Sequence, residues 1–391
     1  MGFLTGSATF ERFRVTEDPT DSFGKDHLAT LKKHRIGTSK GNRYETPDVG
    51  FTGGAHLLDT SFDLEKNIIG DAMHFGIRID SCSIPGPIKR AWMHLELQAV
   101  QSDKPGSRPT KAQREEAKEA VEARCIDEAA KGNYQRMSIT PVLWDSMSET
   151  LYLGSTSEKS NDVCLDLLNR AFGLDFSRVT SGKLAQEFAE SVEHTEALYD
   201  ASPSSFHPEA GGSVVWWNGM NDNYDYLGNE FLLWLWWHWE TNSDMIALSD
   251  STEVSGMFAR SLSLDCPAGE SGRESISSDS PVALPEAMVA IRMGKLPRKA
   301  GLTLVRDGEQ YDFALKAETF SVGSARISQV GDSGLRDAID RIESVRQLSE
   351  TIDLLFEVFC QSRLGSDWAK VQKKIEKWLK ADSAPQSRKA A

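Results

Sequence analysis

Apolar residues recur along this chain with the spacing of a helix in several separate segments. In each segment an apolar residue returns every three or four positions, which places the apolar side chains on one face of a helix. The segments with this spacing are 88–101, 158–172, 284–293, 335–359 and 367–379. A further helix is predicted from Thr110, a good N-cap residue, to Gly132, a good residue just beyond a helix end. Acidic and basic residues alternate through it, so most of its surface should face water.

Other segments favour strands, because they alternate apolar and polar residues or are rich in β-branched and aromatic residues. These segments are 10–15, 134–144, 150–154, 243–266, 302–306 and 311–318. The turn at 145–148 joins two of them into a predicted hairpin. Since helices and strands do not alternate regularly, we expect an α+β fold rather than a doubly wound sheet.

The segment 221–240 is predicted to be a buried helix, because after Gly228 it is apolar on nearly every face. Six of the ten tryptophans lie between Trp216 and Trp239. Their neighbours are leucines and a phenylalanine rather than Lys or Arg, so core packing is a better interpretation than stacking on nucleobases. The densest apolar stretch, 231–239, is about half of the roughly 20 residues that a membrane-spanning helix needs.

The length of 391 residues allows two or three domains. Proline, serine and glycine mark 201–212 as a loop, and the polar segment 267–281 is expected to be mobile. The predicted organisation is an N-terminal α+β region at 1–200 with a helical arm at about 86–132, a tryptophan-rich helical insertion at 201–242, a C-terminal α+β region at 243–380 and a disordered tail at 381–391.

The net charge of −14 means that a polyanionic partner must meet a local basic surface rather than the whole molecule. Residues 25–43 hold six basic residues against one acid, and residues 292–299 hold four basic residues and no acid. The last predicted helix carries Lys370, Lys373, Lys374, Lys377 and Lys380 opposite its apolar face. Each cluster alone is more often a solvated surface. Together, in an acidic chain, they are typical of one segregated basic channel.

The five cysteines form no C-x-x-C pair, which fits reduced thiols in the cytosol better than a disulfide framework or a thiolate zinc site. The first residues lack the basic and apolar regions of a secretory leader. The sequence therefore predicts a cytoplasmic protein without a membrane anchor.

Catalytic motifs are incomplete in this chain. His94 and Glu96 have the H-x-E spacing of a zinc deaminase, but the cysteine ligands of that site are missing. A nuclease needs carboxylates that converge on magnesium, and Asp48 with Glu116 and Lys118 fits that pattern only loosely. Phosphate-binding glycine loops and the G-x-S-x-G elbow are absent. We predict neither a metal nor a cofactor.

Certain segments follow one another in an order that matches a known family. They are 49–51 with its glycine turn, 84–91, 134–138, 142–145, 151–153, 172–173, 294–295 and the strand pair within 302–318 before the long helix. This collinear order resembles the RdgC family of bacterial recombination-associated proteins over most of the chain, and no single motif is diagnostic. The chain is longer than short members of the family, chiefly through 216–240.

The resemblance implies a homodimer that closes head to head into a ring, with duplex DNA passing through a positively charged hole. It implies no established catalytic activity, although some members are labelled exonucleases. In the family an aromatic residue, followed two positions later by arginine, matters for assembly and DNA binding; these positions correspond to Tyr134 and Arg136. Short members of the family have a Lys-Gln pair that contacts DNA. This chain has Asp279 and Ser280 at those positions, so the resemblance does not imply this contact here.

The sequence thus predicts a multi-lobed α+β protomer that forms a ring-shaped dimer on double-stranded DNA at the nucleoid. Such a dimer would bind without sequence preference and limit the access of the strand-exchange recombinase during recombination. The predicted phosphate contacts are Lys32, Lys33, Arg35, Arg136, Lys295, Arg298 and Lys299, and Tyr134 is predicted at the dimer interface. The alternatives are a metal-dependent exonuclease and a protein-interaction module built on the tryptophan-rich core.

Overall fold

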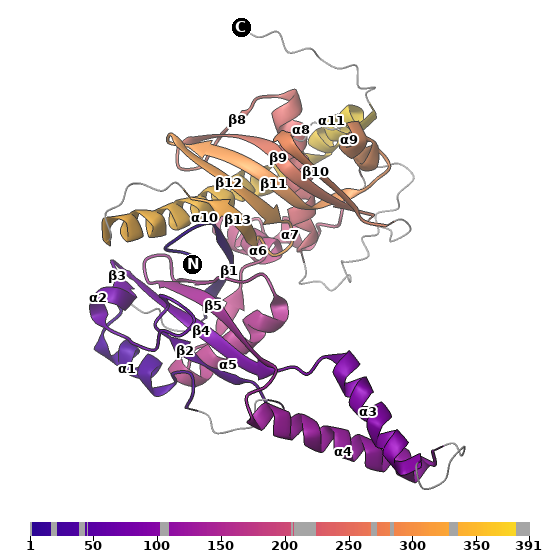
Figure 1. Cartoon of the computed structure of the whole chain (residues 1–391). Coiled ribbons are helices and arrows are strands. Elements are labelled where there is room, and N and C mark those ends of the chain that lie inside the picture. The colour runs from indigo at the N-terminus through magenta and orange to yellow at the C-terminus, as the bar shows by residue number, and fades with distance from the viewer. Residues whose placement is uncertain are drawn as a thin grey trace.

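The computed structural model describes residues 2–16, 22–38, 44, 46–101, 109–204, 206, 224–266, 272–281, 285–327 and 335–380. It shows a mixed α+β protein in which one long antiparallel sheet runs through two lobes and helices pack against it (Figure 1). The α+β expectation is confirmed at this level.

The strands are β1 (Ala8–Val15), β2 (Asp48–Thr52), β3 (Ile68–Ile69), β4 (Ala72–Cys82), β5 (Gln135–Asp145), β6 (Thr150–Leu153), β7 (Phe176–Arg178), β8 (Met245–Ala247), β9 (Glu253–Asp265), β10 (Glu274–Pro281), β11 (Leu296–Arg306), β12 (Glu309–Lys316) and β13 (Val322–Arg326). The helices are α1 (Lys25–Lys33), α2 (Leu64–Asn67), α3 (Gly86–Gln101), α4 (Lys111–Ala130), α5 (Glu158–Phe172), α6 (Ser181–Ser191), α7 (Thr195–Tyr199), α8 (Tyr226–Thr241), α9 (Pro285–Arg292), α10 (Leu335–Arg363) and α11 (Trp368–Lys380).

Strand β1 joins the two lobes. The strand order is β10-β9-β11-β12-β13-β1-β6-β5-β4-β2, and β1 pairs with β13 near its start and with β6 and β7 further along. We call the side with β2 to β7 the N-terminal lobe and the side with β8 to β13 the C-terminal lobe. The main hydrophobic core contains Phe10 and Tyr152 from the first and Leu232 and Phe356 from the second. Residue 200, the expected boundary, therefore does not separate two cores.

The N-terminal lobe has a second core on the other face of its sheet. Leucines of α1 and α5 pack there against Phe13, Phe51 and Phe75 of the strands. The predicted hairpin is formed by β5 and β6, and the Ser148 hydroxyl donates to Asp145 in the turn at 2.6 Å.

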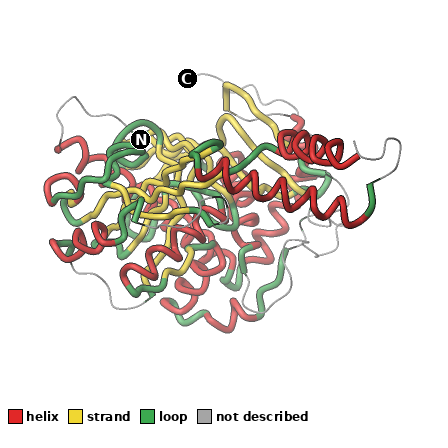
Figure 2. The backbone as a smooth tube through the Cα atoms, turned by 60° about the horizontal axis from the view of Figure 1, so that its bottom comes forward, coloured by secondary structure: helices red, strands yellow, loops and turns green. Residues whose placement is uncertain are grey.

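A helical arm interrupts the pairing of β4 with β5. These strands are in register up to Cys82 and Gln135, and the whole helical hairpin of α3 and α4 lies between those two residues. Helix α4 begins after Thr110, as predicted, with a capping box in which Thr110 and Gln113 satisfy each other's backbone N–H groups. A small cluster that includes Trp92 and Cys125 packs the root of the arm. Figures 1 and 2 show the arm projecting away from both lobes.

Helix α8 lies inside the C-terminal lobe, as its apolar pattern predicts. Its side chains from Tyr226 to Trp237 are buried between the sheet and helices α6, α10 and α11. Trp216 and Trp217, which belong to the same predicted cluster, lie outside the described residues. Among the described residues no helix is both long and apolar enough to cross a membrane.

Helix α10 ties the two lobes together through charged contacts. Arg346 donates to both carboxylate oxygens of Asp145, at 2.5 and 2.9 Å, and Asp145 is fully buried. Two turns further along α10, Asp353 accepts two hydrogen bonds of 2.7 Å from the buried Arg12 of β1. Salt bridges to buried partners hold the lobes in one relative position more firmly than exposed pairs would.

The segment 267–281 was expected to be mobile, and this is wrong for its second half. Residues 274–281 form the edge strand β10, which pairs with β9 from Glu274 to Pro281. The strand offers one apolar residue, Ile276, among serines, so its own sequence carries little strand signal. The conformation of β10 is determined by its backbone hydrogen bonds with β9, which cannot be recognised from the sequence of β10 itself. Residues 267–271, and the tail 381–391 that was predicted to be disordered, lie outside the described residues.

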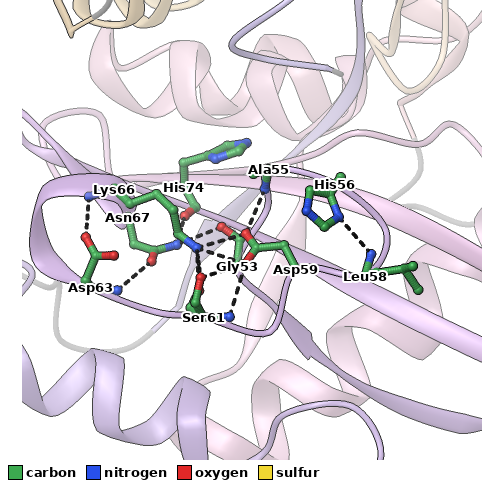
Figure 3. Close-up of polar contacts among 10 residues, drawn as sticks. All are labelled: Gly53, Ala55, His56, Leu58, Asp59, Ser61, Asp63, Lys66, Asn67 and His74. Carbon is green, nitrogen blue, oxygen red and sulfur yellow. Dashed lines mark hydrogen bonds and ion pairs between the residues drawn. The ribbon is translucent and has the colours of Figure 1, made fainter.

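The glycine turn after β2 is held by a dense polar cluster (Figure 3). Asp59 accepts hydrogen bonds from the backbone of Ala55, from the backbone and hydroxyl of Ser61, and from the ammonium of Lys66 at 2.8 Å. These donors hold the pKa of Asp59 well below its usual range, although burial acts in the opposite direction. A Cβ at Gly53 would overlap the Asp59 carboxylate and the Lys66 ammonium. Since its polar groups satisfy one another, the cluster serves to fix the turn.

His74 lies beside this turn with its ring directed away from the cluster (Figure 3). It is buried, and its Nε2 has no hydrogen-bond partner among the described residues. Burial lowers the pKa of His74 to about 4, and Lys66 acts in the same direction.

The depressed pKa of His74 predicts a loss of stability in mild acid. The unfolded chain takes up this proton near pH 6.5 and the folded one only near 4, so the stabilisation is complete above pH 6.5 and is lost as pH falls towards 4. Between pH 7 and pH 5 this group should cost about 2 kcal/mol of unfolding free energy. Urea unfolding of His74→Leu should show a smaller decline over that interval. The exposed His94, changed to Gln, is the control and should leave the decline unchanged; equal slopes in wild type and His74→Leu would contradict the assignment.

Candidate nucleic-acid interface

One face of the C-terminal sheet is open and polar, whereas the other is apolar and covered. Leu262, Leu302 and Leu304 point to the covered face, where α8 packs on β9 and β11. Alternate residues of the same strands point the other way, because successive side chains of a strand leave opposite faces. The side chains on this open face, all exposed or half-buried, include Ser261, Ser263, Ser275, Ser277, Lys299, Thr303, Ala314, Lys316 and Arg326.

Two lysines stand directly opposite each other on the open face. Lys299 of β11 pairs in register with Lys316 of β12, and Ser263 is the partner of Lys299 on the other side. Neither ammonium has an acidic partner within the described part of the chain. Like charges directly opposite in a sheet are destabilising. An anion bound between these two facing lysines would remove their repulsion and so lower the free energy of the protein.

A bulge in β9 directs a third cation onto the same face. The pairing of β9 with β11 shifts register between Ala300 and Leu302, and Arg260 within the bulge has a φ of 64°. A β-bulge commonly redirects a side chain in this way. Gly301 makes the bulge possible, because a Cβ there would overlap the carbonyl oxygen of Ala259. The Arg260 guanidinium lies 3.5 Å from Asp312, which also accepts a bond of 2.7 Å from Thr303.

Small side chains make the open face accessible to a wide ligand. Serine, alanine, glycine and threonine separate the basic residues, and Gly323 of β13 lies beneath the Lys299 ammonium. Two acids on this face are already engaged: Asp312 with Arg260 and Thr303, and Asp265 with Arg273 and Arg298. Glu253, at the start of β9, faces the same way and is exposed. The excess of positive charge therefore lies around Lys299 and Lys316, far along the strands from Glu253.

Two of the predicted phosphate contacts are occupied within the protein. Lys295 is 6% exposed, and its ammonium donates to Glu274 at 2.6 Å and to the Gly272 carbonyl at 2.9 Å. Arg298 is held between Glu318 and Asp265 at the end of the sheet. In this conformation neither charge is available to a phosphate, so the prediction for these two residues is corrected. The cluster at 292–299 looked uniformly basic only because its acidic partners lie elsewhere in the sequence.

The remaining predicted contacts are exposed but lie apart from Lys299. Lys32 and Lys33 are exposed at the end of α1, and Arg35 follows where the chain pairs with the edge strand β2. Arg136 is exposed at the start of β5, next to the root of the arm. Five strand steps separate β11 from β5 in the sheet order, which at about 4.8 Å each is about 24 Å. One protomer therefore does not gather these basic residues on a common surface.

Tyr134, the predicted dimer contact, lies where the arm returns to the sheet. It has a φ of 59° and its carbonyl accepts from the Ser83 backbone at 3.2 Å. The side chain is half-buried against the cluster at the root of the arm. Its role in assembly stays a prediction.

Sequence reasoning missed Lys316 and Arg260. Lys316 ends a strand that the sequence predicted, but only the β11–β12 register reveals that it faces Lys299. Arg260 stands in a segment predicted as plain strand, and the bulge that turns it outward comes from Gly301 on another strand. The one sequence signal was the glycine itself, since an isolated glycine in a strand often marks a bulge.

The residues that loosely match a magnesium-dependent nuclease site lie on two separate elements. Asp48 lies on β2 opposite Asp80, whereas Glu116 and Lys118 lie on α4 of the arm, where Lys118 pairs with Glu115 at 3.1 Å. Across the described ranges, no group of three or more His, Cys, Asp or Glu residues is arranged to hold a metal ion.

Comparison with known proteins adds no relative. No protein-family model matches the chain, and no curated protein matches it. The resemblance to the RdgC family therefore stays a prediction from the sequence.

Proposed function

We propose that the protein binds double-stranded DNA without sequence preference, through the open face of the C-terminal sheet. The observation that supports this best is the unpaired row of Lys299 and Lys316 on a surface of small hydroxyl and glycine residues. Phosphate contacts from Lys, Arg and Ser position a protein on DNA but carry no sequence information. A flat face also lacks the helix or ribbon that reads base edges in the major groove.

A duplex fits this face better than a single strand. Surfaces that bind single strands combine basic residues with aromatic side chains on which unpaired bases stack. On the described part of the open face the large exposed apolar side chain is Met257, and the polar side chains are serine, threonine, lysine, arginine and a few acids. The face therefore offers phosphate contacts without a stacking platform.

The proposal extends to a homodimer that encircles the duplex and modulates recombination by limiting recombinase access at the nucleoid. The resemblance to the RdgC family supports this extension, and the projecting arm with Tyr134 and Arg136 at its root supplies a surface for contact between protomers. In a dimer, the exposed Lys32, Lys33, Arg35 and Arg136 could line the DNA path from one protomer while Lys299 and Lys316 line it from the other.

Binding should weaken steeply with salt and be nearly the same for unrelated sequences. Three cations on the open face, Lys299, Lys316 and Arg326, would give a slope of log affinity against log salt of about −2.7 for one protomer and about twice that for a dimer. Fluorescence anisotropy with two unrelated 30-base-pair duplexes and a matched single strand would measure this. Absence of binding at low salt, or a preference for one duplex, would contradict the proposal.

A cleavage assay distinguishes DNA binding from nuclease activity. Labelled linear duplex is incubated with the protein and magnesium or manganese, and a parallel sample receives a chelator. A DNA-binding protein leaves the strands intact in both samples, whereas a metal-dependent exonuclease shortens them only without the chelator.

A further inference from the structure

Helix α11 presents a second basic surface, separate from the open sheet face. Its buried side chains, Trp368, Ile375 and Leu379, pack into the main core. The opposite side carries Lys370, Lys373, Lys374, Lys377 and Lys380, all exposed. We call these five residues the α11 lysine face.

Most of this charge is not matched by acids in the part of the protein that the structure describes. Lys370 is paired with Asp367 at 2.7 Å, and Glu376 accepts a hydrogen bond from Gln372. Lys374 also interacts electrostatically with Asp367, whereas Lys373 and Lys377 have no acidic partner among the described residues. The unmatched positive charge persists although the whole chain has a net charge of −14, so these lysines can attract a polyanion locally.

Helix α8 lies between α11 and the sheet. Trp236 of α8 stacks on Phe258, on the covered face of the sheet, with ring centroids 5.1 Å apart. Trp236 also lies 6.4 Å from Trp378 of α11. The order is thus sheet, α8, α11. With layer spacings of about 10 Å, the two basic faces are about 20 Å apart, so an anion on one cannot contact the other.

The composition of the α11 lysine face favours a nucleic acid over other anionic partners. Interfaces with proteins are depleted in lysine and rely on aromatic or aliphatic anchors, and the apolar side of α11 is already buried in the core. For the same reason the helix cannot insert its apolar side into a membrane surface. Lys373, Lys374, Lys377 and Lys380 form a stripe about 10 Å long, which is suited to phosphates along one strand.

We propose that the α11 lysine face binds a second segment of duplex DNA, so that one protomer bridges two duplexes. The bridging step rests on the proposed function, because the open sheet face holds the first duplex. The second contact involves lysine ammonium groups and phosphates only, so it is also independent of sequence and sensitive to salt.

A capture assay tests the bridge directly. A biotinylated duplex on beads is saturated with protein, washed, and offered a second, fluorescent duplex of unrelated sequence at low salt. The variant Lys373→Gln/Lys374→Gln/Lys377→Gln should capture at least about tenfold less of the second duplex, while its affinity for a single duplex in solution stays within about twofold. Glutamine has nearly the helix propensity of lysine, so α11 should keep its fold, which circular dichroism verifies.

The control removes charge elsewhere, through Lys159→Gln/Lys183→Gln on α5 and α6, and should capture as much as wild type. If wild type binds the first duplex but captures no second one, or if the α11 variant captures as much as wild type, the bridging inference is wrong and the proposed function stands. If wild type does not bind the first duplex at all, the proposed function itself fails. Loss of capture in the control as well would show a general charge effect and also overturn the inference.

Discussion

Replacing Lys299 and Lys316 together by glutamine should weaken duplex binding about sixtyfold at 0.1 M salt. Loss of two phosphate contacts makes the slope of log affinity against log salt shallower by about 1.8, and at 0.1 M salt this corresponds to about 1.8 decades of affinity. The loss should be the same for every duplex sequence, because these lysines would touch phosphates only. Anisotropy titrations at several salt concentrations give both the affinity and the slope.

The same variant should be slightly more stable than the wild type. The two ammonium groups face each other across β11 and β12 without an acidic partner in the described structure, and removing like charges from directly opposite positions relieves a repulsion of a few tenths of a kcal/mol. A functional site is expected to contain residues that lower the stability of the protein but strengthen its binding. A thermal melt with and without duplex separates the two effects.

The matched control is Lys159→Gln/Lys183→Gln, which removes the same charge from exposed positions on α5 and α6. It should leave affinity within about twofold, since long-range effects of exposed charges are screened at this salt concentration. Equal losses in both double variants would mean that net charge, rather than the open sheet face, governs binding. No loss in Lys299→Gln/Lys316→Gln would remove the open face from the proposal.

The helices and the buried nature of α8 could be predicted because their signal is local. A period of three to four residues is visible within a single segment, and it located α5, α9, α10 and α11 to within a few residues. Strand β10 could not be predicted, because its serines acquire a strand conformation only through pairing with β9. The position of β1 between β13 and β6 was equally hidden, since it depends on contacts across most of the chain.

The candidate site shows the same division between local and non-local information. Lys299 was predicted from a local excess of basic residues, but the same reasoning selected Lys295, whose partner Glu274 is 21 positions away. Lys316 was missed because a single lysine at a strand end has no local significance. Charge along the sequence therefore indicates where cations are, and only strand register and ion pairing decide which of them are free to bind an anion.

Replacing Arg363 by methionine should destabilise the protein by about 3–5 kcal/mol, the cost of stranding a buried charge. The Arg363 guanidinium donates to Glu230 at 2.6 Å and to the Ser202 carbonyl at 2.7 Å, and the side chains of Arg363 and Glu230 are 8% and 2% exposed. Burial disfavours the charge of Arg363, but the charge of Glu230 compensates and raises the pKa of Arg363. Methionine keeps most of the volume and leaves the Glu230 carboxylate without its counter-ion in the main core.

A second substitution decides whether the stranded carboxylate causes this loss. Glu230 also accepts a bond of 2.6 Å from the backbone of Ser204, and glutamine can keep that bond without a charge. Arg363→Met/Glu230→Gln should therefore regain more than half of the lost stability in urea unfolding, since uncharged replacements of a buried pair are often nearly neutral. Lys118→Met, in an exposed pair with Glu115, should cost less than about 1 kcal/mol. If the double variant is as unstable as Arg363→Met, the contacts of Arg363 with Ser202 and the Trp368 ring, 5.0 Å from its guanidinium, stabilise this core instead of the charge pair.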